Sequence, residues 1–175
     1  MSNARTLANT INSSSEIVVP SGGVNFGIST DGSGTVTGGV LDDYEEGTWT
    51  PSITRSISAP AVTYTTQLGS YTKIGRTVHV SGHLSWSANS GGSGHFRIAG
   101  LPFTIATGSA NYSTMNSVDY NGVTFATNAV TFGGYGAIGG THIVLLNGLN
   151  NGTSSVVING LASTGFIYFD MTYNT

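Results

Sequence analysis

The four histidines of this chain are its best candidates for binding a metal ion. His79 and His83 lie in a segment that alternates polar and apolar side chains, a pattern that indicates a β-strand. The step between them spans roughly 13 Å of strand at about 3.3 Å per residue, too far for both rings to bind one ion. His95 and His142 fall in other predicted strands. We therefore predict structural or exposed roles for the histidines and no metal site.

Motifs for catalysis are incomplete in this sequence. Ser70-Tyr71-Thr72-Lys73 matches the Ser-x-x-Lys pattern of penicillin-recognising enzymes, but the helical setting and the partner motifs of that family are missing. No glycine-rich phosphate loop opens a helix, no paired buried carboxylates stand out, and no motif joins Ser, His and Asp. We predict that the protein is not an enzyme, has no catalytic residues and uses no cofactor.

Half of the chain's 8 acidic residues lie in one short segment, Leu41–Pro51. They are Asp42, Asp43, Glu45 and Glu46. Adjacent carboxylates are costly to bury, so we expect them to be exposed, whereas Trp49 is predicted to be buried and to anchor the first strand. The acidic cluster and Asp31-Gly-Ser-Gly fit neither the EF-hand loop nor a nonapeptide calcium repeat. Whether the cluster faces a partner, a cation or water stays open.

Charge and hydropathy exclude several partner classes. Charged residues make up 7% of the chain and the net charge is −3, so the sequence offers no basic stripe for a phosphate backbone. No apolar run approaches the roughly 20 residues that cross a bilayer, and no secretory signal opens the chain. We predict a soluble protein that binds neither nucleic acid nor membrane. The apolar content of 38% with little charge predicts a folded chain.

Residues 1–40 are predicted to form an N-terminal attachment and assembly arm, because no segment within them can build a core. Its apolar side chains are the candidate docking residues, either on the chain's own β-domain or on neighbouring subunits or a larger assembly. Both alternatives stay open. The candidates are Leu7, Ile11, Val18, Val19, Val24 and Phe26.

Residues 41–175 are predicted to form an antiparallel β-sandwich of jelly-roll type. The clearest strand is Arg76–Trp86, in which Val78, Val80, Leu84 and Trp86 point to one face and polar side chains to the other. About ten such short strands follow one another, with no helical period between them. The final segment, 165–175, has apolar side chains on both faces, so it is either a central strand or a contact with another subunit.

Four Asn-Gly dipeptides are predicted to form tight hairpin turns, since they tolerate positive φ. They are Asn121-Gly122, Asn147-Gly148, Asn151-Gly152 and Asn159-Gly160. Three tyrosines on or beside glycine-rich loops are candidate ligand-facing residues, which stack on a sugar or instead cover the ends of the sandwich. These are Tyr112, Tyr120 and Tyr135.

Two motifs resemble a module of structural proteins of tailed bacteriophages, many from marine and cyanobacterial hosts, including tail fibres and capsid surface proteins. The motifs are Leu41-Asp-Asp-Tyr-Glu-Glu-Gly-Thr-Trp-Thr-Pro51 and Tyr71-Thr-Lys-Ile-Gly-Arg-Thr-Val-His-Val80. Ser2-Asn-Ala-Arg-Thr-Leu-Ala8 is similar to the segment that opens many fibre-like proteins of this kind. The resemblance covers the first ten residues and roughly residues 41–86.

The resemblance implies a homotrimer on the virion surface, assembled in the host cytoplasm and attached through its N-terminal segment to a capsid or tail protein. The chain has neither the repetitive shaft nor the large tip of a long tail fibre, which favours a compact capsid decoration or cement protein. The alternative is a short tail fibre or adhesin that binds a host-surface glycan. A polysaccharide depolymerase would need a carboxylate pair in a groove, for which the sequence gives no sign.

Overall fold

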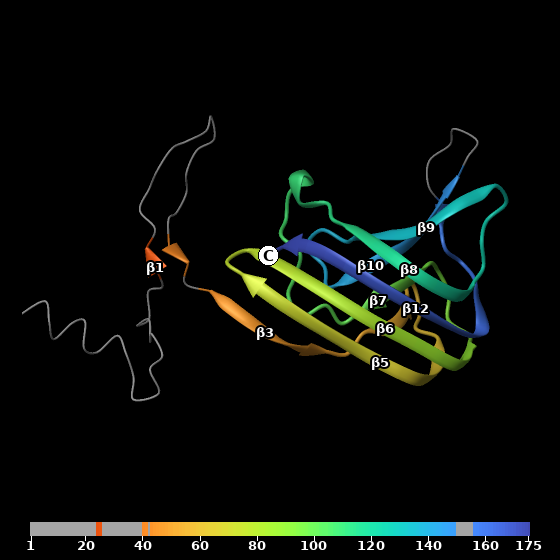
Figure 1. The fold of residues 1–175 in the computed structure, drawn as a ribbon. Coiled ribbons are helices and arrows are strands. Elements are labelled where there is room, and N and C mark those ends of the chain that lie inside the picture. Colours follow the sequence, from red (N-terminus) through yellow and green to blue (C-terminus); the bar gives the residue numbers. More distant parts are fainter. Residues whose placement is uncertain (1–23, 26–39, 42, 150–155) are drawn as a thin grey trace, which may run out of the picture. The chain divides into compact units, whose positions relative to one another are not determined.

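The structure is a computed structural model that describes residues 24–25, 40–41, 43–149 and 156–175 (Figure 1). The chain forms two compact units, Met1–Tyr44 and Glu45–Thr175. In the first unit, strands β1 (Val24–Asn25) and β2 (Val40–Leu41) pair antiparallel. Most of the predicted arm lies outside the described residues, so its attachment role and its boundary at residue 40 stay predictions.

The remaining strands form one sheet of ten strands, in the order β3-β5-β6-β12-β8-β9-β10-β7-β4, with β11 paired to β10. A short 3-10 helix, η1 (Ser109–Asn111), precedes β8. The strands are β3 (Tyr44–Trp49), β4 (Ser52–Arg55), β5 (Ala61–Ile74), β6 (Thr77–Ser90), β7 (Phe96–Ala99), β8 (Thr114–Val123), β9 (Ala129–Gly136), β10 (His142–Leu149), β11 (Val156–Val157) and β12 (Leu161–Asn174).

The predicted all-β antiparallel class is confirmed, but the jelly-roll sandwich is not. A sandwich needs two sheets packed face to face, whereas nine of these strands follow one hydrogen-bonded path and β11 pairs with β10 beside it. Figure 1 shows the long strands β5, β6, β12 and β8 side by side in this sheet. The final segment is a central strand, since β12 pairs with β6 on one side and with β8 on the other.

The sheet curls until its two edge strands approach each other. β3 and β4 stand at opposite ends of the strand order, yet only Thr50 and Pro51 separate them in the chain. Because that step spans at most roughly 11 Å, the two edges lie close together at this point. We call this junction the seam.

Side chains of β5 bridge the seam. The Tyr64 hydroxyl accepts a hydrogen bond from the backbone N–H of Ile53 in β4 at 2.6 Å. Gln67 Nε2 donates to the Pro51 carbonyl oxygen at 3.0 Å. Burial raises the pKa of Tyr64 above its usual 10, so the hydroxyl stays protonated to still higher pH. Side-chain hydrogen bonds thus connect β5 to the start of β4 at the seam, where the backbone hydrogen bonding between neighbouring strands ends.

The core lies on the inner side of the curled sheet and is formed by alternate residues of each strand. On β6 the inward side chains Val78, Val80, Leu84 and Trp86 are buried, as their spacing predicts. Buried side chains of the neighbouring strand β12 and of β7 and β10 belong to the same core cluster. These include Phe96, Ile98, Ile143, Leu145, Ile167, Phe169, Met171 and Tyr173.

Two of the predicted hairpin turns are wrong. Asn121-Gly122 lies inside β8 and Asn147-Gly148 inside β10. Gly122 has φ of +75° and a Cβ there would come within 2.3 Å of the Thr164 carbonyl oxygen, opposite a register shift in β12. Gly122 thus allows a close backbone approach, whereas Gly148 leaves room for the Thr131 side chain beside a register shift in β10. Both are uses of glycine inside strands with irregular pairing. Asn151-Gly152 lies outside the described residues, and Asn159-Gly160 falls between β11 and β12.

Candidate functional site

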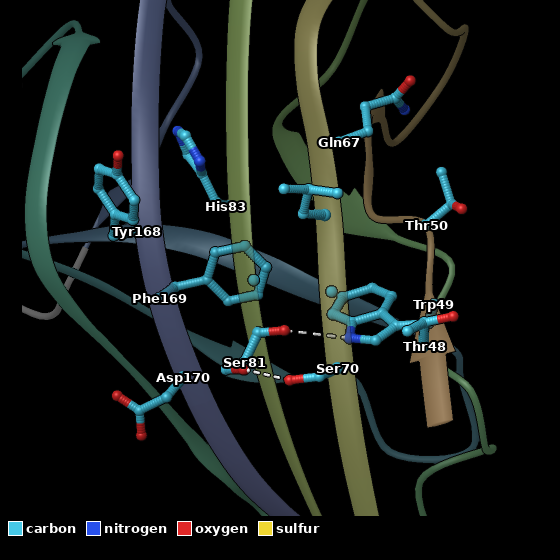
Figure 2. Close-up of a pocket in the computed structure, with 13 residues that line it drawn as sticks. Thr48, Trp49, Thr50, Gln67, Ser70, Ser81, His83, Tyr168, Phe169 and Asp170 are labelled. Carbon is cyan, nitrogen blue, oxygen red and sulfur yellow. Dashed lines mark hydrogen bonds between the residues drawn. The ribbon is translucent and has the colours of Figure 1, made fainter. Parts of the chain in front are cut away.

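An open groove with a volume of about 690 Å³ crosses strands β3, β5, β6 and β12 (Figure 2). Several of its residues are exposed, so it opens to solvent on the side of the sheet away from the core. We call it the outer groove. Its lining residues are Thr48, Trp49, Thr50, Gln67, Leu68, Gly69, Ser70, Ser81, Gly82, His83, Tyr168, Phe169 and Asp170.

The strand register arranges the outward side chains of the outer groove in two rows. In the first row, Leu68 of β5 pairs with His83 of β6, which pairs with Tyr168 of β12. Residues two apart on a strand point to the same face, so the next outward row lies two positions along. In Figure 2, His83 and Tyr168 lie on one side of the Phe169 ring, and Ser70, Ser81 and Asp170 lie on the other. The second row consists of Ser70, Ser81 and Asp170.

The floor between these rows is backbone, because the intervening row of Gly69, Gly82 and Phe169 points inward. A Cβ on Gly69 would come within 2.4 Å of Trp49 Nε1, and a Cβ on Gly82 within 2.3 Å of Phe169 Cζ. Both aromatic rings therefore lie directly against the strands from the core side. Each glycine supplies the space that its neighbouring ring occupies.

Trp49 lies under this floor and is 8% exposed. Its ring meets Phe169 edge to face, with the centroids 6.1 Å apart. Its Nε1 reaches across β5 and donates a hydrogen bond to the Ser81 carbonyl oxygen at 3.2 Å. This placement fits the predicted anchoring role, and the free energy that the anchor contributes stays a prediction.

One wall of the outer groove is apolar. The rings of His83 and Tyr168 stack with their centroids 4.0 Å apart and their planes 17° apart. Tyr168 is 43% exposed and Leu68 is 64% exposed. Large apolar side chains are normally buried, because burial removes their surface from water. Here they stay exposed to solvent, which makes this wall a candidate contact surface.

The other wall is polar. The hydroxyls of Ser70 and Ser81 share a hydrogen bond at 2.8 Å. Asp170 is the one lining residue with a charge at pH 7. Such a set can exchange hydrogen bonds with a ligand's hydroxyl groups. A single carboxylate without a second acid across the groove does not match the arrangement used for glycoside hydrolysis.

The predicted ligand-facing tyrosines lie elsewhere and do not form one site. Tyr112 is 65% exposed and its ring centroid is 5.9 Å from that of Tyr135. Tyr120 packs instead on Phe132 and Phe125, with centroid distances of 4.6 and 5.6 Å. Tyr120 therefore covers the edge of the core, whereas Tyr112 and Tyr135 form a separate surface pair.

Among the predicted docking residues, Val24 lies within the described residues; it pairs with Leu41 and is 41% exposed. The others lie outside the described residues, and the docking role of the set stays a prediction. They are Leu7, Ile11, Val18, Val19 and Phe26.

The acidic cluster is exposed at Asp43, Glu45 and Glu46, while Asp42 lies outside the described residues. The Tyr71 hydroxyl of β5 donates a hydrogen bond to the Glu45 carboxylate. That bond raises the pKa of Tyr71, because a negative charge beside the hydroxyl opposes its ionisation. In the described ranges, no three His, Cys, Asp or Glu residues gather to hold a metal ion.

Sequence reasoning did not single out Leu68, His83 and Tyr168 as one site. His83 was expected to be structural or exposed, and Tyr168 was part of the two-faced final segment. The available signal was an apolar residue on the wet face of a strand, as at Leu68. Pairing these residues requires the order and register of β5, β6 and β12, which are set by contacts far apart in sequence.

The sequence and the fold were compared with known proteins in three ways, and one of these found a similar structure. No family model matches the sequence, and no curated protein matches it. The crystal structure of the Dettilon tailspike protein (gp208) is similar, with a TM-score of 0.60 and 17% sequence identity. The similarity covers 75% of this chain and 24% of that chain, so this chain spans about a quarter of the tailspike's length. At this identity the similarity shows a shared fold.

The part of the chain that the structure describes contains no helix that would reach across the apolar layer of a bilayer.

Proposed function

We propose that this chain is a structural protein of a bacteriophage virion whose β-domain acts as a tail-fibre or tailspike-type adhesin. The observation that carries the proposal is the fold shared with a tailspike over 75% of the chain. The resemblance of Leu41–Pro51 and Tyr71–Val80 to phage structural proteins supports it independently. The protein works without catalysis and contacts the host surface through its outer face.

The structure explains why the two motifs belong together. β3 contains Tyr44–Trp49 of the first motif and lies beside β5, in which the second begins. The Glu45 carboxylate accepts a hydrogen bond from Tyr71. A Cβ on Gly47 would come within 2.9 Å of the same tyrosine ring. The motifs therefore form one packed edge of the sheet, which supports treating them as one module.

Capsid decoration is the second candidate, favoured by the resemblance of the same motifs to capsid surface proteins. In that case a homotrimer holds neighbouring capsid subunits through its N-terminal arms. A homotrimer belongs to both candidates, because fibres and decoration proteins of this kind share it.

Immunogold labelling of intact phage particles separates the two candidates. We expect label at the tail, and we expect excess purified protein to reduce adsorption of the phage to its host. Label over the head together with unchanged adsorption would favour decoration. Particles without label at either place would contradict the virion role itself. The mass of the purified protein in solution tests the trimer.

A further inference from the structure

We propose that the outer groove is a binding site for an uncharged sugar chain, a neutral stretch of a host-surface polysaccharide. This inference rests on the proposed adhesin function and makes it more specific. It places recognition on the face of β5, β6 and β12, away from the loops that carry Tyr112 and Tyr135.

The apolar wall suits the C–H faces of pyranose rings. Sugars pack these faces on aromatic and aliphatic side chains, while their hydroxyls stay at the rim. The stacked rings of His83 and Tyr168 hold each other upright at 4.0 Å, so little side-chain freedom is lost when a ligand packs on them. Leu68 extends the same wall by one strand.

The polar wall supplies partners for the hydroxyls. Ser70 and Ser81 use one hydrogen bond between themselves, and each oxygen keeps further capacity to accept. The Asp170 carboxylate can accept hydrogen bonds from two neighbouring sugar hydroxyls. In the part of the chain that the structure describes, no side chain donates a hydrogen bond to this carboxylate.

The size and openness of the groove suit a chain of sugars. Each row crosses β5, β6 and β12, and strands in a sheet lie about 4.8 Å apart, so the walls run for roughly 10 Å. The groove holds about 690 Å³ and is open to solvent, so a polymer can enter and leave it. A closed pocket would instead select a small molecule.

Charge selects between neutral and acidic sugars. The lining residues include one carboxylate, Asp170, and neither Lys nor Arg. A uronate or sulfate in the groove would face a like charge with no cation to offset it, which is unfavourable. The groove therefore favours an uncharged chain over an acidic one.

The test is a titration of the full chain, followed by NMR and calorimetry, with four hexasaccharide probes. Three are neutral, maltohexaose, cellohexaose and the β-1,4-linked hexamer of N-acetylglucosamine, and one is acidic, hexagalacturonate. We expect at least one neutral probe to bind and to shift the ring signals of His83 and Tyr168. Tyr168→Ala should weaken that binding about tenfold, the effect of losing one aromatic contact.

Tyr112→Ala is the matched control, since it removes an exposed tyrosine from the other aromatic pair and should leave binding unchanged. Asp170→Lys adds a readout that does not depend on the apolar wall, because it should raise the affinity for hexagalacturonate. The proposal is overturned if no neutral probe binds, if the wild type prefers hexagalacturonate, or if Tyr168→Ala binds as well as wild type. If the Tyr168→Ala protein still labels the tail and still blocks adsorption, the adhesin function stands. That result would reject only the assignment of sugar binding to this groove.

Discussion

At the residue scale, the packing beside the outer groove depends on glycines that face aromatic rings. Trp49 occupies the space that a side chain on Gly69 would fill, and Phe169 does the same at Gly82. The indole is also fixed by its hydrogen bond to Ser81, so it cannot move aside. In this region the sequence thus places a glycine on one strand beside a large aromatic residue on the adjacent strand.

Trp49→Ala should lower the free energy of unfolding by about 3 to 5 kcal/mol, because it leaves a cavity beside Phe169 and removes a hydrogen bond. Urea denaturation followed by circular dichroism measures the loss. Tyr168→Ala is the matched control, since that ring is 43% exposed and its removal leaves no cavity in the core. A loss below about 1 kcal/mol for Trp49→Ala would refute the anchor.

His142 should make stability depend on pH. Burial, with a smaller contribution from the Arg97 charge, lowers the pKa of His142 below its usual 6.5 in the folded state. As the pH falls through the unfolded pKa of about 6.5, His142 binds a proton in the unfolded chain but not in the folded chain. The stability of the folded state is therefore full above this pKa and decreases on acidification. We expect His142→Gln to lose less stability than wild type between about pH 7.5 and 5.5. An NMR titration that places the His142 midpoint at or above 6.5 would contradict this.

At the element scale, the seam between β3 and β4 is the unusual feature of the sheet. Strand edges normally expose unpaired N–H and C=O groups, which are open to pairing with other chains. Here the chain crosses directly from one edge to the other, and Tyr64 satisfies the Ile53 N–H. Pro51 suits the crossing, because proline has no N–H to leave unpaired.

Tyr64→Phe should destabilise the protein by about 1 to 3 kcal/mol, the cost of leaving a buried N–H without its acceptor. Ile53 is 5% exposed, so water cannot easily replace the hydroxyl. Tyr112→Phe makes the same chemical change at an exposed site and should alter stability by less than about 0.5 kcal/mol. Equal effects of the two variants in thermal denaturation would mean that the seam does not depend on Tyr64.

At the scale of the whole molecule, the core formed by the described residues belongs to one unit. The buried core side chains run from Trp49 to Tyr173, all within Glu45–Thr175. The surface that covers them is polar but weakly charged, since charged residues make up 7% of the chain. Uncharged hydroxyl and amide groups therefore supply most of its polar atoms, and these groups can exchange hydrogen bonds with sugars.

Removing residues 1–39 should leave a folded β-domain, because the buried core residues among those that the structure describes run from Trp49 to Tyr173. We expect a cooperative thermal transition and a circular dichroism spectrum dominated by strands. If the arm holds the assembly together, the shortened chain should also lose its trimeric mass in light scattering. A fragment that aggregates without a cooperative transition would show that the β-domain needs the arm to fold.

The sequence by itself determined what depends on local pattern. Period-2 alternation in Arg76–Trp86 gave the strand and its buried face, because neighbouring residues of a strand point to opposite sides. The cost of burying adjacent carboxylates predicted the exposure of Asp43, Glu45 and Glu46, and the apolar indole predicted the burial of Trp49. These inferences require no knowledge of partner strands.

The tertiary structure decided everything that depends on which strands meet. Local pattern cannot distinguish one curled sheet from a two-sheet jelly roll, because both need the same alternation. The local sequence of Asn121-Gly122 predicts a turn, but the dipeptide lies inside β8 because this segment pairs with β12. Leu68, His83 and Tyr168 became one wall only because the register of β5, β6 and β12 brings them side by side, and that register is set by burial across the whole sheet.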